Sequence, residues 1–247
     1  MKKFEGWLLC SDLDGTFELC RENFEAIDYF RKNGGRFTVT SGRNSDYIRK
    51  IDGLRSDVPA VILNGALVCD IEKDETIYRS LLGDCLYEVL EYVSYDDNID
   101  EVYVHTGQES MSYALGTKLP ERGWSKVVFV ERDEAAAVRL KDKLKEKFSD
   151  RLSIFRSWSR CVEVLPCGQN KGTAVRFLVD YLGDVTKLIC VGDYENDIDM
   201  IAAADIGFAV ENAIDEVKAV ADVILPPFNE NAIVHLIKYL DELGVRS

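Results

Sequence analysis

Proline, histidine and paired cysteines are scarce in this sequence. Five prolines in 247 residues argue against long disordered linkers. The two histidines, His105 and His235, are too far apart and too isolated to suggest a histidine metal site, so each is expected to be packed or on the surface. The seven cysteines include no Cys-x-x-Cys pair, and Cys10, Cys69 and Cys190 lie in apolar runs. We therefore expect reduced, buried thiols and a cytoplasmic protein.

Long apolar runs and clustered positive charge are also missing. No window predicts a membrane span, and the apolar run 7–10 that follows Lys2 and Lys3 is too short for the core of a signal peptide. The formal net charge is −14, and acidic residues interrupt the densest basic run, 141–147, at helical spacing. Nucleic acid and membranes are therefore not expected as partners. An acidic protein that binds an anionic substrate must bring a cation to the site.

The first informative segment of the sequence is a short apolar run that ends in acidic residues. Residues 7–10 predict a buried strand, which runs directly into Ser11-Asp12-Leu13-Asp14-Gly15-Thr16. Side chains alternate along a strand, so Asp12 and Asp14 are expected on one side, close enough to share a cation or a substrate. Two crowded carboxylates repel each other unless a metal or a proton relieves them. The alternative is an ordinary turn, in which Asp and Gly are common.

Two more predicted strands in the first third of the chain end in polar residues. Strand 36–40 is followed by Ser41, Gly42 and Arg43, which suit either an anion site or a helix N-cap. Strand 59–63 is followed by Asn64, and helices are predicted at 21–33 and 45–51. This alternation indicates an α/β fold with a parallel, doubly wound sheet, whose ligands bind at the carboxyl ends of the strands.

The middle of the chain departs from this pattern. Helices are predicted at 85–93 and 135–148, and the strands near 101–105, 124–131, 154 and 162–164 alternate polar with apolar residues. We predict an inserted second domain over residues 82–166, with the main domain formed by residues 1–81 and 167–247. The least regular stretch, 107–123, is expected to be a connecting loop, although it could face a substrate.

A second acidic cluster appears when the alternation resumes. Lys171 opens a helix, and strand 188–191 ends in Gly192-Asp193-Tyr194-Glu195-Asn196-Asp197. Because strand ends converge in a doubly wound sheet, we predict one cleft lined by Asp12, Asp14, Ser41, Lys171, Asp193, Asn196 and Asp197. Clustered carboxylates suit Mg²⁺, which shares its ligands with phosphates. Ser41 and Lys171 would neutralise and orient the phosphoryl oxygens.

These motifs, taken in order, resemble those of the haloacid dehalogenase superfamily. The resemblance rests on the segments 12–16, 41–43 and 192–197 and on Lys171. The Asn64-Gly65-Ala66 turn, the Asn212-Ala213 pair and the insert are similar to the Cof-type phosphatases. The resemblance covers nearly the whole chain, and it implies a Rossmann-like α/β core with an inserted α/β cap. Tyr194 departs from the pattern, because a small residue is common there, and it could narrow the site.

The resemblance also implies a role for each motif residue. Asp12 would be the nucleophile that forms an aspartyl phosphate, and Asp14 would protonate the leaving oxygen and then activate water. Mg²⁺ would be held by the Asp12 carboxylate, the Asp14 backbone carbonyl and Asp193, with Asn196 and Asp197 supporting them. Phosphate or substrate would be bound by Ser41, Gly42, Arg43, Asn64, Lys171 and Asn196.

The leading prediction is a magnesium-dependent phosphatase of small phosphorylated metabolites, with sugar phosphates the class that the resemblance favours. A phosphomutase is the nearest alternative, because it would return the group from the same aspartyl phosphate to its substrate. Dehalogenation fits less well, since it needs neither magnesium nor the acidic cluster. A signalling receiver domain is much shorter and carries its phosphoacceptor on a middle strand. A non-catalytic phosphate-binding protein would not require both Asp12 and Asp14.

Overall fold

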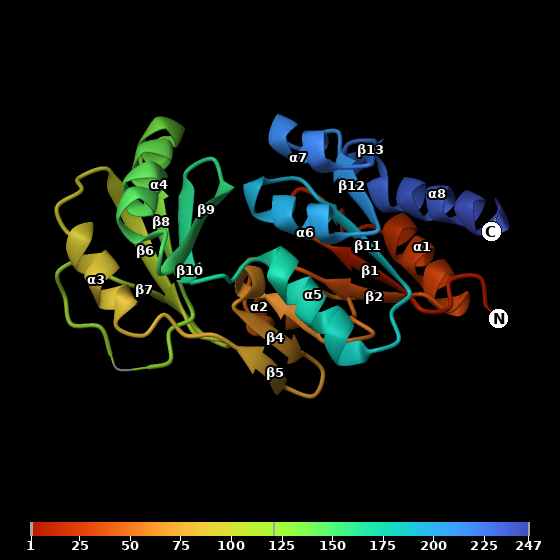
Figure 1. The fold of residues 1–247 in the computed structure, drawn as a ribbon, viewed down its shortest axis with the longest axis horizontal. Coiled ribbons are helices and arrows are strands. Elements are labelled where there is room, and N and C mark those ends of the chain that lie inside the picture. The colour runs from red at the N-terminus through yellow and green to blue at the C-terminus, as the bar shows by residue number, and fades with distance from the viewer. Residues whose placement is uncertain (1, 121, 247) are drawn as a thin grey trace.

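The structure is a computed structural model that describes residues 2–120 and 122–246. These residues form a five-stranded parallel sheet, a five-stranded antiparallel sheet and a three-stranded antiparallel sheet. Figure 1 shows the parallel sheet on the right, with both chain ends, and the five-stranded antiparallel sheet on the left. No helix in the described ranges combines the length and the apolar character that a bilayer crossing demands.

The parallel sheet has β1 near its centre. Its strand order is β13-β12-β11-β1-β2, and β1 pairs in parallel with both β11 and β2. The residues that follow β1 therefore leave the sheet beside those that follow its two neighbours. The strands are β1 (Trp7–Ser11), β2 (Arg36–Val39), β11 (Lys187–Gly192), β12 (Ile206–Val210) and β13 (Val223–Leu225).

Helices cover both faces of this sheet, because the side chains of β1 alternate between two apolar clusters. Leu8 packs in one cluster with Val175 of α5 (Lys171–Leu182) and Met200 of α6 (Ile198–Ala203). Leu9 packs in the other with Phe30 of α1 (Arg21–Lys32) and with side chains of α8 (Ala232–Arg246). Two short helices, α2 (Ser45–Arg49) and α7 (Asp215–Val220), follow β2 and β12. The predicted doubly wound α/β core is confirmed.

The strand predicted at 59–63 is present, but it pairs mainly outside the parallel sheet. Segment 59–63 gives β3 (Ala60–Ile62), which pairs antiparallel with β4 (Leu67–Asp70) and meets the parallel sheet only at one bridge between Thr40 and Val61. The unpredicted β5 (Glu75–Arg79) extends this small sheet. The chain reverses directly after β3 because Leu63 and Asn64, in the 3-10 turn η1 (Leu63–Gly65), adopt φ values of 50° and 54°. Another 3-10 turn, η3 (Phe228–Glu230), precedes α8.

The inserted cap is an antiparallel sheet with helices on one face. Its strand order is β7-β6-β8-β10-β9. Apolar side chains from alternate strand positions pack against the helices, as Val127 and Val162 do. The opposite face is turned toward the core, as the predicted alternation requires. The elements are α3 (Cys85–Tyr92), β6 (Ile99–His105), β7 (Ser110–Ser112), β8 (Lys126–Glu131), α4 (Glu134–Phe148), β9 (Leu152–Trp158) and β10 (Cys161–Pro166).

Candidate active site

The loop after β1 carries Asp12 to the edge where the strand ends meet. Asp12 is buried, and its backbone N–H donates to the carbonyl of Val191 on β11 (3.0 Å). Gly15 adopts a φ of +84°, and a Cβ there would lie 2.5 Å from Asp193 Oδ2. The Thr16 hydroxyl donates to Asp193 Oδ1 (2.9 Å). A glycine is therefore required for this loop to wrap around Asp193.

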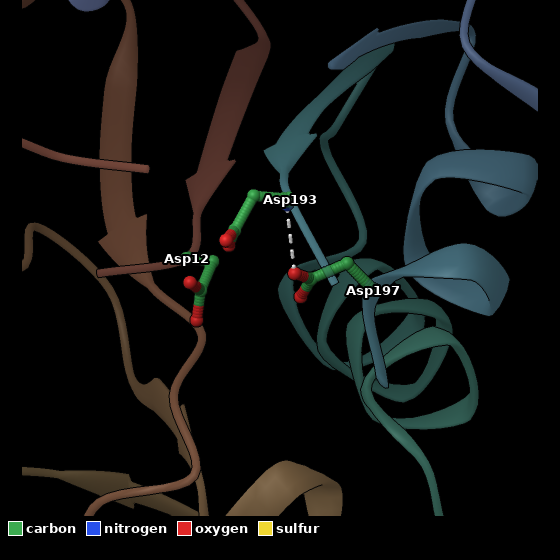
Figure 2. A group of neighbouring side chains, drawn as sticks. All are labelled: Asp12, Asp193 and Asp197. Atoms are coloured by element: carbon green, nitrogen blue, oxygen red, sulfur yellow. Dashed lines mark hydrogen bonds between the residues drawn. The ribbon is translucent and has the colours of Figure 1, made fainter. Parts of the chain in front are cut away.

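Two more acids come from the loop between β11 and α6, which contains the 3-10 turn η2 (Glu195–Asp197). Asp197 Oδ2 accepts hydrogen bonds from the backbone N–H groups of Asp193 (3.0 Å) and Tyr194 (3.1 Å). Figure 2 shows the first of these bonds, with Asp12 opposite Asp193. The loop thus holds Asp197 by its own backbone and presents Asp193 to Asp12.

Lys171, the first residue of α5, is a buried cation between two of these acids. Its Nζ lies 2.5 Å from Asp12 Oδ1 and 2.5 Å from Asp197 Oδ1. The start of α5 is fixed by Asn170, whose side chain accepts from the backbone N–H of Thr173 (2.7 Å). Burial by itself lowers the pKa of an ammonium, but the charges of Asp12 and Asp197 outweigh it and raise the pKa of Lys171. Lys171 is therefore a permanent positive charge.

The acidic donor set fits a divalent cation. Asp12, Asp193 and Asp197 each place a carboxylate oxygen within 4.8 Å of the others. Burial raises the pKa of Asp12 well above its usual range, although the charge of Lys171 opposes the shift. Burial, reinforced by the charge of Asp197, raises the pKa of Asp193 to about 7. The raised pKa values mean that Asp12 and Asp193 tend to hold protons, and a hard cation with oxygen ligands, such as Mg²⁺, would stabilise their ionised forms instead.

Asp14 occupies a different environment from Asp12. Its half-exposed carboxylate accepts two hydrogen bonds from Arg43, at 2.9 Å from Nε and 3.0 Å from Nη2. This contact raises the pKa of Arg43. The backbone N–H of Arg43 donates to the buried Ser41 Oγ (3.1 Å), and the Arg43 guanidinium lies over the Tyr47 ring, 4.4 Å from its centre. The loop after β2 thus holds the second acid in a fixed position.

A chain of buried polar side chains links the core loops to the cap. Asn196 Nδ2 donates to Asn64 Oδ1 (3.0 Å), and Asn64 Nδ2 donates to Glu163 Oε2 on β10 (2.7 Å). Glu163 Oε2 also pairs with Lys126 Nζ on β8 (2.8 Å), and the same Nζ donates to the Gly42 carbonyl (2.7 Å). The cap therefore contacts the core at two points. Lys126 binds the backbone of the loop after β2, and Glu163 binds Asn64, which in turn accepts from Asn196 in the loop after β11.

A cavity of about 660 Å³ lies between the cap sheet and the strand ends of the core. It is large enough for a small metabolite. Six of the residues predicted for the site line it: Asp12, Asp14, Gly42, Arg43, Asp193 and Asn196. The other four are buried beside these residues: Ser41, Asn64, Lys171 and Asp197.

Ten cap residues that line the cavity are absent from the predicted site, and three of them bear on its polar contacts. These three are His105, Lys126 and Glu163. His105 was expected to be packed or on the surface, and it is half-buried, with Nδ1 2.7 Å from Ser110 Oγ. The sequence does carry a signal for Lys126 and Glu163. Each is a charged residue in a largely apolar strand, at a position whose side chain faces away from the cap helices.

Buried carboxylates and a buried lysine thus lie together at the strand ends of a doubly wound sheet, beside a cavity that the cap covers. A model of the haloacid dehalogenase-like hydrolase family matches residues 9–111 and 85–237. The chain belongs to this family, as its four motifs predict.

Relatives and solved structures resemble this chain in sequence or in fold. A haloacid dehalogenase-like hydrolase structure from Bacillus subtilis superposes with a TM-score of 0.83 at 19% identity, covering 94% of this chain and 99% of that one. A Haemophilus influenzae protein with the provisional name of phosphatase is 31% identical over 148 residues, which are 60% of this chain. A chloroplastic endoribonuclease from Arabidopsis thaliana is 26% identical over 256 residues, covering 88% of this chain. The chain spans 52% and 43% of these two relatives.

Proposed function

We propose that the protein is a magnesium-dependent phosphatase that hydrolyses small phosphorylated metabolites through an aspartyl phosphate on Asp12. The observation that carries this proposal is the contact of Lys171 Nζ with both Asp12 and Asp197 at 2.5 Å, inside a buried acidic cluster that opens on a capped cavity. Membership of the hydrolase family supports it. Sugar phosphates are the substrate class that the motif resemblance favours.

In the first step, a carboxylate oxygen of Asp12 attacks the phosphorus and the bond to the leaving oxygen breaks. Lys171 holds Asp12 Oδ1, which orients the other oxygen for attack. Asp14 gives a proton to the leaving oxygen, and the alcohol departs. In the second step, Asp14 takes a proton from water, whose oxygen attacks the phosphorus. The acyl phosphate bond then breaks, which releases inorganic phosphate and restores Asp12.

The metal would be held by the Asp12 carboxylate, the Asp14 backbone carbonyl and Asp193. When bound, Mg²⁺ supplies positive charge that stabilises the transferring phosphoryl group. Both oxygens of Asp197 already have partners, in Lys171 and in two backbone N–H groups, so its role is to fix the loop and the lysine.

The remaining polar groups would hold the phosphoryl oxygens and the loops that carry them. Ser41, Lys171 and the Gly42 backbone bind phosphate, and Arg43 orients Asp14 through its two hydrogen bonds. Asn64 and Asn196 form one hydrogen-bonded pair beside them, and Asn196 Oδ1 is buried without a partner within the described ranges 2–120 and 122–246. A substrate or metal-bound group at the site would satisfy that oxygen.

The test is release of inorganic phosphate from a panel of phosphate monoesters, with and without Mg²⁺. We expect turnover that a chelator abolishes and Mg²⁺ restores, and we expect Asp12→Asn to remove it. Glu22→Gln, an exposed acid outside the cavity, is the control. Full turnover by the Asp12 variant, or by metal-free enzyme in excess chelator, would exclude the mechanism. Transfer to a second position of the substrate without free phosphate would indicate a phosphomutase.

A further inference from the structure

We propose that the leaving group of the substrate carries an aromatic or heteroaromatic ring, which lies between aromatic side chains of the core and of the cap. The inference rests on the proposed function and narrows its substrate class. It contrasts with the sugar phosphates that the motif resemblance favours, because a polyol and a flat ring need different cavity walls.

Aromatic side chains enter the cavity from both domains. Tyr47 on α2 and Tyr194 in the loop after β11 belong to the core, and Tyr103 on β6 and Trp158 on β9 belong to the cap. Tyr47 and Trp158 remain 44% and 58% exposed, although each has an apolar ring that would gain by burial. The Tyr103 hydroxyl donates to Glu101 Oε2 (2.6 Å), so the polar end of that ring already has its partner.

The central strand of the cap adds an apolar floor between these rings. Residues 126, 128 and 130 of β8 share one face, and the two beyond Lys126 are Val128 and Val130, both of which line the cavity. The polar end of this floor lies near the reacting phosphate, because Lys126 donates to the Gly42 carbonyl. The distal part of the cavity, where the leaving group would extend, is thus aliphatic and aromatic.

Several polar side chains around the cavity are already bonded to one another, which disfavours a polyol. Asn44 accepts from the backbone N–H of Tyr47 (2.9 Å) and donates to Ser110 Oγ (3.0 Å), which in turn contacts His105 Nδ1. Lys126 and Glu163 form a buried pair, and Glu163 Oε1 also accepts from Ser157 (2.5 Å). The hydroxyls of a sugar would therefore displace existing bonds or be buried without partners.

His105 offers a single neutral contact to a ring. Its Nε2 is buried and has no protein partner among the residues that the structure describes, and it belongs to a residue that lines the cavity. Burial and the nearby charges of Lys126 and Arg43 lower the pKa of His105 to about 2, so the imidazole stays uncharged. One uncharged hydrogen-bonding atom beside several aromatic faces suits a heteroaromatic ring better than a chain of hydroxyls.

The test compares two esters of primary alcohols, 2-phenylethyl phosphate and glucose 6-phosphate, with the full-length protein and Mg²⁺. Acetyl phosphate, which has no ring or polyol, reports phosphatase activity independently. We expect kcat/KM for the phenylethyl ester to exceed that for the sugar ester by about tenfold or more. A ratio of one or below, with acetyl phosphate hydrolysed, overturns the ring inference and leaves the proposed function standing. No phosphate release from all three compounds overturns both.

Two variants test which side chains cause the preference for the phenylethyl ester. Trp158→Ser and Tyr103→Ser should lower the ratio between the two esters severalfold, by raising KM for the phenylethyl ester more than they change kcat. Tyr95→Ser is the matched control, because Tyr95 is a cap residue that is 92% exposed and lies outside the cavity. Unchanged ratios in both folded variants, or an equal drop in the control, would overturn the assignment of these rings to the leaving group.

Discussion

At the scale of single residues, Asp12 and Asp14 show how two acids in one motif acquire different chemistry. Asp12 is buried and contacts Lys171, whereas Asp14 is half-exposed and is held by Arg43. In the proposed mechanism, Lys171 would keep an oxygen of Asp12 in place for attack, and Asp14, which lines the cavity, would pass a proton to and from a substrate or water.

The proposed roles predict opposite behaviour for two isosteric variants. Asp14→Asn keeps the nucleophile and loses the proton donor and base, so alkyl phosphates should turn over about a hundred- to ten-thousand-fold more slowly. An aryl phosphate whose leaving group needs no proton should still phosphorylate this variant, and the aspartyl phosphate should accumulate. Intact mass spectrometry, with hydroxylamine to remove the adduct, measures it. An adduct on Asp12→Asn instead would reverse the two assignments.

At the scale of elements, the sequence predicts the site well where strands end and poorly where the cap meets the core. Asp12, Ser41 and Asp193 each follow a predicted strand, and parallel pairing brings the carboxyl ends of such strands to one edge of the sheet. The misplaced β3 has the same apolar signature as a parallel strand, and the reversal after it depends on positive φ at Leu63 and Asn64, which local sequence does not demand.

The contacts of Lys126 and Glu163 could not be predicted from sequence, because their partners lie in the core. Lys126 donates to Gly42, and Glu163 accepts from Asn64, across a separation of 84 and 99 residues respectively. Their strands are recognisable from the alternation, but the direction in which the cap folds over the core is set by tertiary packing. For the same reason the aromatic lining of the cavity emerges only from the structure.

A second contact between elements couples the cap to the core loop that carries Asp193 and Asp197. Glu195 in η2 pairs with Lys141 of α4 (2.9 Å) and with Arg156 of β9 (3.4 Å), and all three side chains are mostly buried. Because Glu195 lies between Asp193 and Asn196 in the chain, an open cap would release a constraint on the loop that presents them.

Glu195→Gln should weaken cap closure and lower kcat/KM about three- to tenfold, mainly through KM, because two charge-assisted contacts lose their carboxylate. The wild-type enzyme should also lose kcat/KM as NaCl increases, and the variant should lose less. Hydrogen exchange of α4 and β9, with steady-state kinetics across a salt series, provides the measurement. Lys145→Gln, on an exposed position of α4, should behave as wild type; an equal effect there would contradict the coupling.

At the scale of the whole molecule, the stability should depend on pH through an acid hidden in the cap. Glu131 is fully buried, and both of its carboxylate oxygens lack a protein partner among the described residues. Burial, with the charge of Asp96 adding to it, raises the pKa of Glu131 to about 7 from an ordinary value of 4.5. The folded state therefore holds this proton more tightly than the unfolded chain.

Because the pKa of Glu131 is higher in the folded state than in the unfolded chain, its contribution to stability is complete below pH 4.5. That contribution is lost as the pH rises to about 7. Glu131→Gln keeps the shape without the charge, so it should be more stable than wild type at pH 8 and nearly equal at pH 4.5. Urea unfolding of both proteins across this range is the measurement. The exposed Glu146→Gln is the control for the general effect of removing one charge from a chain of −14. Equal pH profiles for the two variants would contradict the role of Glu131.

The central position of β1 also has a consequence for how the molecule is made. Thr16 and Asp193, which share a hydrogen bond in the finished site, are 177 residues apart in the chain, and β1 needs β11 as its neighbour. On a ribosome, the cap strands 99–166 emerge before β11 and can find one another first. The nascent chain must carry β1 and its two acids with one edge unpaired until β11 appears, which is the interval in which a chaperone would matter most.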